Sequence, residues 1–297
     1  MKSGVVIINK GKGLSSQAVV NRLKRLLGAK KAGHTGTLDP LATGVLPVLV
    51  ERGVKASEYM LSSDKHYQAI MLLGITTDTE DVLGKVLTES DLIPAEGDVL
   101  LAADSMLGEH MQTPPMYSAL KVGGEKLYDL ARRGITVERE PRRITVHRIN
   151  TKRLSDKEYE LDVVCSKGTY IRTLCADIGK KLSCGAVMKE LCRASCAGFS
   201  LEEAHTLDQI EAMSQAEREA LIIPIEEIFK DKVRLVLPPF FARLARNGLP
   251  IYQKKIKTDI KEGERVALFD ENGFFALGES VMLEDGAAIK PIKQFDT

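Results

Sequence analysis

The sequence predicts an α+β protein that carries a second, small β-rich domain at its C-terminal end. The chain has 297 residues, enough for one large and one small domain that each bury a core. The first part of the chain mixes strand-like and helix-like patterns of apolar residues, and the composition changes after Phe229. We therefore expect a large domain at residues 1–232 and a separate one at residues 233–297.

The large domain begins with a strand and a helix. The apolar run from Val5 to Ile8 is typical of a buried strand, and a glycine-rich turn follows it. Ser15 or Ser16 can cap a helix whose apolar residues recur at helical spacing, and Gly28 ends that helix. Residues 33–44 come next and are rich in Gly, Thr and Pro, so we expect a loop there.

Two alternating segments predict further strands of the large domain. Apolar residues alternate with others from Tyr67 to Leu73 and again from Tyr159 to Cys165, as in half-buried strands. The second strand turns at Gly168 and is followed by a helical pattern. Tyr170 and Arg172 therefore lie at a strand-to-helix junction, a place that often displays functional side chains.

A basic segment is expected to form an arm inserted into the large domain. Residues 113–119 precede it and cannot be helical, because adjacent prolines fix their own backbone and favour extended geometry before them. The arm, residues 121–143, contains two arginine pairs. Its local charge matters more than the formal net charge of +1, because binding phosphates needs a basic surface rather than a basic total.

The C-terminal domain is predicted from short strand-like pieces separated by turns. Residues 265–269 and 274–279 have strand patterns, and Glu-Gly and Asn-Gly pairs mark turns between the pieces. Lys254, Lys255 and Lys257 make one part of this domain basic.

Composition and motifs argue against membranes, metals and cofactors. Apolar residues make up 44% and charged residues 28% of the chain, as in folded soluble proteins, and no stretch approaches the roughly 20 apolar residues of a membrane span. The five cysteines form no C-x-x-C pair, and the histidines show no metal-site spacing. No phosphate-binding or dinucleotide glycine motif is present. We expect a cytoplasmic protein with reduced thiols, no metal and no small-molecule cofactor.

One loop aspartate is a candidate for chemistry. Asp39 lies between Leu38 and Pro40, on a loop whose glycines let a ligand approach the backbone closely. The pattern alone has a simpler interpretation, since Thr-Leu-Asp-Pro is good turn chemistry. A phosphorylated-aspartate site is excluded by the order of residues, because there the aspartate precedes the Thr-Gly-Thr run.

The segment from Gly33 to Pro47 closely resembles the signature of the TruB type of tRNA pseudouridine synthases. It reads GHTGTLDPLATGVLP, and its length makes the likeness specific. Further segments agree in order, namely NK at 9–10, KHY at 65–67, TDTED at 77–81, PPMYSALK at 114–121 and GTYIR at 168–172. Two positions depart from the family pattern: Gly11 stands where proline is usual, and Cys192 where a basic residue is common.

The resemblance implies a fold, a reaction and a substrate. The fold is the pseudouridine synthase catalytic fold, a mixed and largely antiparallel central sheet flanked by helices and loops, followed by a PUA-like RNA-binding domain. The reaction isomerises uridine 55 in the T loop of tRNA: uracil is detached from its ribose, rotated and rejoined through carbon 5. Such a reaction needs no redox cofactor or energy donor. We expect a monomer whose partner is tRNA, bound through its T stem-loop.

The resemblance also assigns roles to site residues. Asp39 matches the catalytic carboxylate, Arg172 matches its arginine partner, and Tyr170 is expected to hydrogen-bond in the same cluster. Tyr67 matches the tyrosine that stacks on the flipped-out uracil. The expected RNA and uracil contacts are His34, Lys10, Leu191, Lys121, Arg142 and Lys254. Asp39 can attack the ribose anomeric carbon or the uracil ring, or help form a glycal, and the sequence does not choose among these routes.

Two other functions stay open at this point. A glycoside-type hydrolase also acts at an anomeric carbon but usually needs two carboxylates, so Asp78 or Asp81 would have to approach Asp39. An RNA-binding protein without catalysis would explain the basic arm and the lysines of the C-terminal domain. It would leave the Asp39 loop and the Arg172 segment unexplained.

Overall fold

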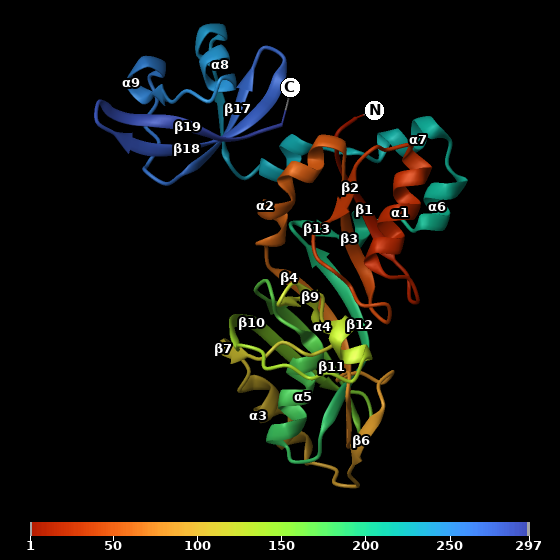
Figure 1. Ribbon diagram of the computed structural model, residues 1–297. Helices are drawn as coiled ribbons and strands as arrows, with labels where there is room; N and C mark the ends of the chain where they lie inside the picture. Colours follow the sequence, from red (N-terminus) through yellow and green to blue (C-terminus); the bar gives the residue numbers. More distant parts are fainter. Residues whose placement is uncertain (1, 296–297) are drawn as a thin grey trace.

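The computed structural model describes residues 2–295, which form a large body and a smaller C-terminal one (Figure 1). A 10-stranded sheet forms the frame of the large body, and a 5-stranded sheet that of the small one. The expected α+β class and the β-rich C-terminal part are both confirmed.

The large sheet is mixed and largely antiparallel, as expected. Its main order is β14-β1-β3-β12-β4-β11-β10-β7, with β2 paired to β3 and β13 paired to β12. The bounds are β1 Gly4–Lys10, β2 Ala32–His34, β3 Thr43–Val50, β4 Lys65–Leu73, β7 Gly108–Gln112, β10 Arg142–Arg153, β11 Glu158–Cys165, β12 Ala186–Cys196, β13 Phe199–Ser200 and β14 Ile223–Pro224. Among the described strands of this sheet, only β12 and β3 run parallel to each other.

Helices cover the two halves of this sheet separately. One half carries α1 (Ser16–Leu27), α6 (Leu207–Ala212) and α7 (Gln215–Ala220), and the other carries α3 (Glu96–Asp104) and α5 (Ile171–Lys181) (Figure 1). The predicted start and end of α1 are confirmed, because Ser15 caps it and Gly28 ends it at a φ of 68°. The helix expected after Tyr170 is α5.

Short elements complete the large body. These are α2 (Ser57–Leu61), α4 (Leu127–Arg132), the 3-10 turns η1 (Glu51–Ala56), η2 (Leu201–Glu203) and η3 (Ile225–Phe229), and the two-stranded pairs β5 (Ile75–Thr77) with β6 (Val86–Glu89) and β8 (Lys121–Val122) with β9 (Glu125–Lys126). Residues 113–119 contain no helix, as predicted.

Two sequence-based boundaries need correction. The loop expected at residues 33–44 is shorter, because its ends belong to β2 and β3. The basic arm expected at residues 121–143 consists of β8, β9, α4 and an extended stretch, and Arg142 and Arg143 already lie in strand β10. The ends of the loop belong to the sheet because β2 pairs with β3, and Arg142 and Arg143 belong to it because β10 pairs with β7; local composition reveals neither pairing.

The C-terminal body has the strand order β15-β17-β18-β19-β16. Its elements are β15 Val233–Val236, α8 Pro239–Arg246, β16 Ile251–Tyr252, α9 Gln253–Ile256, β17 Arg265–Asp270, β18 Gly273–Leu283 and β19 Gly286–Gln294. The predicted strand pieces at 265–269 and 274–279 are β17 and part of β18. Helix α8 was not expected after the two prolines, but a proline suits the first helical position because its fixed φ is already helical.

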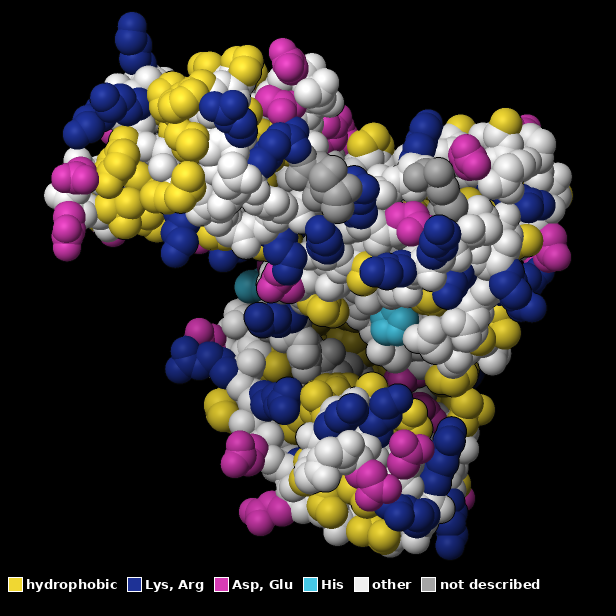
Figure 2. Space-filling view, turned by 45° about the horizontal axis from the view of Figure 1, so that its top comes forward, with side chains coloured by type: hydrophobic (Ala, Val, Ile, Leu, Met, Phe, Trp, Pro, Cys, Tyr) yellow, Lys and Arg dark blue, Asp and Glu magenta, His cyan; other side chains and the backbone are white. Residues whose placement is uncertain are grey.

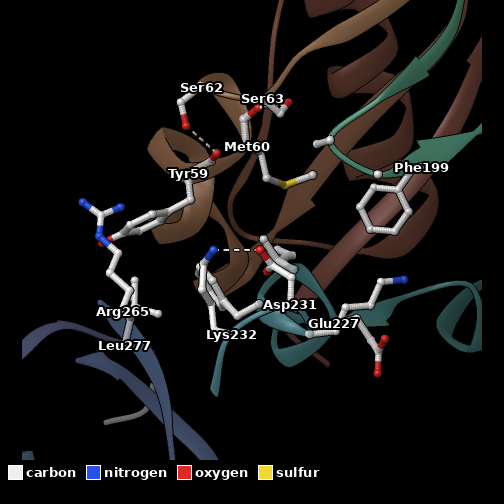
Figure 3. A pocket seen from close by; sticks show the side chains of 15 residues that line it. Tyr59, Met60, Ser62, Ser63, Phe199, Glu227, Asp231, Lys232, Arg265 and Leu277 are labelled. Atoms are coloured by element: carbon white, nitrogen blue, oxygen red, sulfur yellow. Dashed lines mark hydrogen bonds and ion pairs between the residues drawn. The ribbon is translucent and has the colours of Figure 1, made fainter. Parts of the chain in front are cut away.

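The two bodies share an aromatic core. The ring of Phe229 lies 5.3 Å from that of Tyr59, 5.7 Å from Phe274 and 5.4 Å from Phe295, measured between centroids. A cavity of about 370 Å³ lies beside this cluster, and the Lys232–Asp231 ion pair lies at its edge (Figure 3). Burial of Phe229 between the bodies therefore holds the C-terminal body against the large one.

Of the helices within residues 2–295, none has the length and apolar character that crossing a membrane requires.

Candidate active site

A cleft of about 620 Å³ contains the loop aspartate singled out from the sequence. Its walls come from the start of α1, the β2–β3 loop, residues 79–83, residues 117–119, the α4 region and the start of α5. Figure 2 shows the large body hollowed between its two halves, with Lys and Arg side chains on both rims. The size suits a single nucleotide with room for its neighbours.

Arg172 joins three separate segments around this cleft. Its Nε lies 3.0 Å from Oδ2 of Asp39, and the guanidinium is 4% exposed whereas the carboxylate is 37% exposed. Nη1 donates to the carbonyl oxygen of Thr79 at 2.8 Å, and Nη2 donates to that of Tyr117 at 2.7 Å. A planar guanidinium with donors in a fixed fork can hold all three partners at once, so it fixes the direction of Asp39.

Lys10 holds the Asp39 loop through hydrogen bonds to its carbonyl groups. Its buried Nζ donates to the carbonyl oxygens of Ala42 at 2.5 Å, Gly11 at 3.0 Å and Pro40 at 3.4 Å. Burial lowers the pKa of this ammonium to about 8. Lys10 was expected to contact RNA. In this structure its ammonium is buried under the loop and binds the loop's own carbonyl groups, and the RNA contact stays a prediction.

Two further contacts set the shape of the same loop. Ser16 Oγ donates to the carbonyl oxygen of Leu38 at 2.9 Å and accepts from the Leu38 N–H at 2.8 Å. Gly44 has a φ of +103°, and a Cβ there would lie 2.3 Å from the carbonyl oxygen of Arg193. The loop that carries Asp39 is therefore held at both ends before any ligand binds.

The charge of Asp39 is balanced between opposing effects. Burial raises the pKa of its carboxyl, the neighbouring Arg172 lowers it, Asp81 raises it and Lys10 lowers it, with a net rise. The carboxylate is thus a stronger base than a free aspartate, while two cations still favour its ionised form.

Asp81 lies behind Arg172 and is itself fully engaged. Its Oδ1 accepts from Thr79 Oγ1 at 2.7 Å and from the Leu83 N–H at 3.0 Å, and its Oδ2 lies 3.9 Å from Nη1 of Arg172. Asp78 is exposed and accepts from the Lys85 N–H at 2.8 Å. Asp81 therefore shares Arg172 with Asp39, and its charge also raises the pKa of Asp39.

Tyr67 and Leu191 lie on adjacent central strands. Tyr67 on β4 is 8% exposed, and burial raises the pKa of its phenol while Arg193 lowers it. Leu191 on β12 is also buried and pairs with Ala69 of β4. Neither side chain is among the described residues that line the cleft. The stacking and packing expected of them stay predictions.

Tyr170 lies at the N-terminal end of α5 with its backbone fixed by Gln112. The Tyr170 N–H donates to Gln112 Oε1 at 2.8 Å, and Gln112 Nε2 donates to the Tyr170 carbonyl oxygen at 3.1 Å. Burial raises the pKa of the phenol, whereas Ser118 and Arg172 lower it and Asp39 raises it. The charges of Asp39 and Arg172 thus reach the Tyr170 phenol, and the hydrogen bond expected of it in their cluster stays a prediction.

The remaining predicted contacts are scattered. His34 in β2 lines the Asp39 cleft; its Nδ1 is buried without a hydrogen-bond partner among residues 2–295, and burial lowers its pKa, which favours the neutral ring. Lys121 and Arg142 line a different hollow of about 310 Å³. Lys254 on α9 donates to the carbonyl oxygen of Asp285 at 3.3 Å. Only His34 of these four joins the cleft.

Sequence reasoning missed Arg193, which is fully buried beside the departure at Cys192. Arg193 Nε donates to the carbonyl oxygen of Val45 at 2.7 Å, and Nη2 donates to that of Gly36 at 3.1 Å. It therefore links strand β12 to the loop that carries Asp39. Within the described part of the chain, no group of three or more His, Cys, Asp or Glu side chains could hold a metal ion.

Comparisons with known proteins agree with this geometry. Residues 24–171 match the family model for the N-terminal domain of TruB family pseudouridylate synthases, and residues 172–230 match that for the tRNA pseudouridylate synthase B C-terminal domain. The tRNA pseudouridine synthase B of Methylobacillus flagellatus is 40% identical over 277 residues, or 93% of this chain and 90% of that one. That of Clostridium tetani is 41% identical over 278 residues, or 93% and 95%.

Solved structures agree on the fold. The match to a Cbf5-Nop10-Gar1 complex has a TM-score of 0.70 and 26% identity, and covers 99% of this chain and 85% of that one. An H/ACA RNP bound to a substrate RNA containing 2'-deoxyuridine matches with a TM-score of 0.72 and the same coverage, at 24% identity. The fold and the family match are those of a pseudouridine synthase, an isomerase. Within that class, the chain belongs to the TruB family.

Proposed function

We propose that this enzyme converts uridine 55 in the T loop of tRNA to pseudouridine, with Asp39 as its catalytic carboxylate. The ion pair between Asp39 and the buried Arg172, at the mouth of a nucleotide-sized cleft, carries this proposal. The tRNA pseudouridine synthases B that share about two fifths of its sequence support tRNA as the substrate.

Reaching the glycosidic bond requires the target uridine to leave its stack. Flipping costs a few kcal/mol, which contacts inside the cleft must offset. Asp39 then acts as nucleophile or base while the bond from ribose C1' to N1 breaks and a bond from C1' to C5 forms. C5 loses its proton and N1 gains one, so the product is an isomer of the substrate. The walls of the cleft exclude water that would otherwise trap the detached sugar.

Aromatic side chains assist from strand β4 and from the start of α5. Tyr170, two residues before Arg172, hydrogen-bonds in the cluster of Asp39 and Arg172 in this proposal, and the charges of both already act on its phenol. Tyr67 contacts the uracil with its ring; because this ring is buried, the contact needs the cleft to widen over β4 when RNA binds. Leu191, on the neighbouring strand, packs against the same base.

The wider surface holds the T stem-loop. His34 occupies space vacated by the flipped nucleotide, while Lys121 and Arg142 bind phosphates beside the cleft. The C-terminal body, PUA-like in this proposal, adds Lys254 as a salt-dependent phosphate contact. The enzyme works as a cytoplasmic monomer.

Hydrolysis is the less favoured reaction. A glycoside hydrolase needs a second carboxylate free to activate water or to protonate the leaving group. One oxygen of Asp81 accepts two hydrogen bonds, and the other lies 3.9 Å from the Arg172 guanidinium, which holds this carboxylate ionised and therefore unsuited to protonate a leaving group. Two carboxylates that share one arginine do not supply the separate acid and base of a hydrolase, which favours isomerisation.

An unmodified tRNA transcript tests the proposal. We expect the wild-type protein to form one pseudouridine, at position 55, when the product is mapped chemically at single-nucleotide resolution. A transcript with cytidine at that position should stay unmodified. Free uracil or an abasic site would show hydrolysis instead, and pseudouridine only at other positions would contradict the assigned target.

A further inference from the structure

We propose that Ser118 is a substrate-binding residue whose hydroxyl hydrogen-bonds to the imide edge of the flipped-out uracil. This inference rests on the proposed function and adds a named contact to it. Ser118 lies in the diproline segment, which forms the wall of the cleft on the α4 side.

The Ser118 hydroxyl is a buried polar group without a partner. The residue is 5% exposed and lines the Asp39 cleft, yet its Oγ has no hydrogen-bond partner among residues 2–295. The Ser118 hydroxyl approaches the Tyr170 phenol, whose pKa a weak contact with Ser118 lowers. About nine in ten buried polar groups are paired, so an unpaired hydroxyl facing a cleft indicates that a ligand supplies the partner.

The backbone on both sides of this hydroxyl is fixed. Arg172 Nη2 donates to the carbonyl oxygen of Tyr117 at 2.7 Å, and the Tyr128 N–H donates to that of Ser118 at 3.1 Å. The same guanidinium binds Asp39. Ser118 and the catalytic carboxylate are therefore held in one fixed arrangement in the cleft. A residue that binds the base and a residue that reacts with the nucleotide need such a fixed relative position.

The chemistry of uracil matches a serine hydroxyl. A hydroxyl both donates and accepts, and the imide edge offers an N–H flanked by two carbonyl oxygens. Turning uracil about its N3–C6 axis exchanges N1 with C5 and also exchanges the two carbonyl groups. The imide edge thus looks the same before and after the rotation that the reaction requires, so a contact there can persist through it.

A second serine in the same cleft provides a matched control. Ser16 is 2% exposed, and its hydroxyl makes two hydrogen bonds with the backbone of Leu38. Removing this hydroxyl leaves a buried N–H and a buried carbonyl unpaired, which destabilises the fold. Removing the Ser118 hydroxyl loses only its weak contact with the Tyr170 phenol in the free enzyme, so it should destabilise the fold far less.

The test compares Ser118→Ala with Ser16→Ala by thermal unfolding and by single-turnover pseudouridine formation on tRNA. We expect Ser118→Ala to unfold within about 1 °C of wild type and to convert tRNA about tenfold more slowly. Ser16→Ala should unfold roughly 3 to 6 °C lower. A wild-type rate for Ser118→Ala would overturn the inference, and so would a loss of stability like that of Ser16→Ala.

A transcript with 2'-deoxyuridine at the target identifies the contacted part of the nucleotide. It keeps the uracil edge and lacks the ribose hydroxyl, so the rate ratio of wild type to Ser118→Ala should be unchanged. Loss of that ratio would place the contact on the ribose and refute the uracil assignment. Wild-type protein on ordinary tRNA runs alongside: absence of pseudouridine there would refute the proposed function, whereas equal rates for the two proteins refute only the role of Ser118.

Discussion

The Asp39 cleft and the cavity between the two bodies are both hollows, but their lining differs: the cavity borders aromatic rings, whereas the cleft contains charged and unpaired polar groups. The interbody cavity borders a cluster of aromatic rings in edge-to-face and tilted contact, and Lys232 at its edge pairs with Asp231. The Asp39 cleft instead contains a half-exposed carboxylate against a buried guanidinium, and two orphaned polar atoms on Ser118 and His34.

This contrast separates stability from function. Aromatic burial between the bodies gains free energy when the chain folds. Desolvating Asp39, Arg172 and an unpaired hydroxyl costs free energy in the free enzyme, and such groups cluster where a ligand or a reaction uses them. Size alone would not have distinguished the two hollows.

Breaking the polar network should have the largest effect. Arg172→Met removes the donors to Asp39, Thr79 and Tyr117, so we expect the single-turnover rate to fall at least about 100-fold and the free energy of unfolding to fall by about 3 kcal/mol. Denaturant unfolding and chemical mapping measure both. The exposed Arg148, paired with Asp162, is the control, and Arg148→Met should cost less than about 1 kcal/mol. A rate near wild type for Arg172→Met would show that the reaction does not need Arg172 to hold the segments of Asp39, Thr79 and Tyr117 in place.

Breaking the aromatic interface should affect stability and spare chemistry. Phe229→Ala removes the ring that touches Tyr59, Phe274 and Phe295, and we expect calorimetry to show a loss of about 3 kcal/mol. The single-turnover rate at saturating enzyme should stay within about threefold, because no cleft contact is lost. Phe240→Ala, at an exposed ring of α8, serves as the control and should change little. Unchanged stability in Phe229→Ala would mean that the two bodies are held together by something else.

The pH dependence of the reaction rate and of stability should show a smaller effect that is specific to the Asp39 cleft. Because burial raises the pKa of Asp39, the rate should fall with decreasing pH at values above the ordinary aspartate pKa of about 3.9. A raised folded-state pKa also means that Asp39 favours folding at low pH, and that this contribution is lost as the pH rises through that value. Stability of Asp39→Asn should lack this component in a pH series. If the protein stays folded and its rate stays constant down to the ordinary aspartate pKa of about 3.9, then burial does not raise the pKa of Asp39.

The local sequence pattern predicted those helices and strands whose caps or apolar periodicity lie within the element itself. Helix α1 has its own caps and apolar face, and β4 and β11 alternate cleanly, so their existence followed from the sequence. Strand β12 did not stand out, because Lys189, Glu190 and Arg193 interrupt its apolar pattern. Arg193 is buried there because it binds carbonyl groups on a loop about 150 residues earlier in the chain.

The candidate site divides in the same way. Turn chemistry alone explained Asp39, and its pairing with Arg172 was expected only from the family resemblance, which the structure then showed as a 3.0 Å contact. The burial of Lys10 and the unpaired hydroxyl of Ser118 depend on which distant segments pack together, and no periodicity encodes that.

The most direct test of the central claim compares Asp39→Asn with Asp78→Asn, an exposed aspartate near the same cleft. Both are mixed in excess with unmodified tRNA, and pseudouridine formation and tRNA affinity are measured together. We expect no pseudouridine from Asp39→Asn, tRNA affinity within a few-fold of wild type, and normal product from Asp78→Asn. Pseudouridine formed by Asp39→Asn would contradict the role of Asp39 as the catalytic carboxylate.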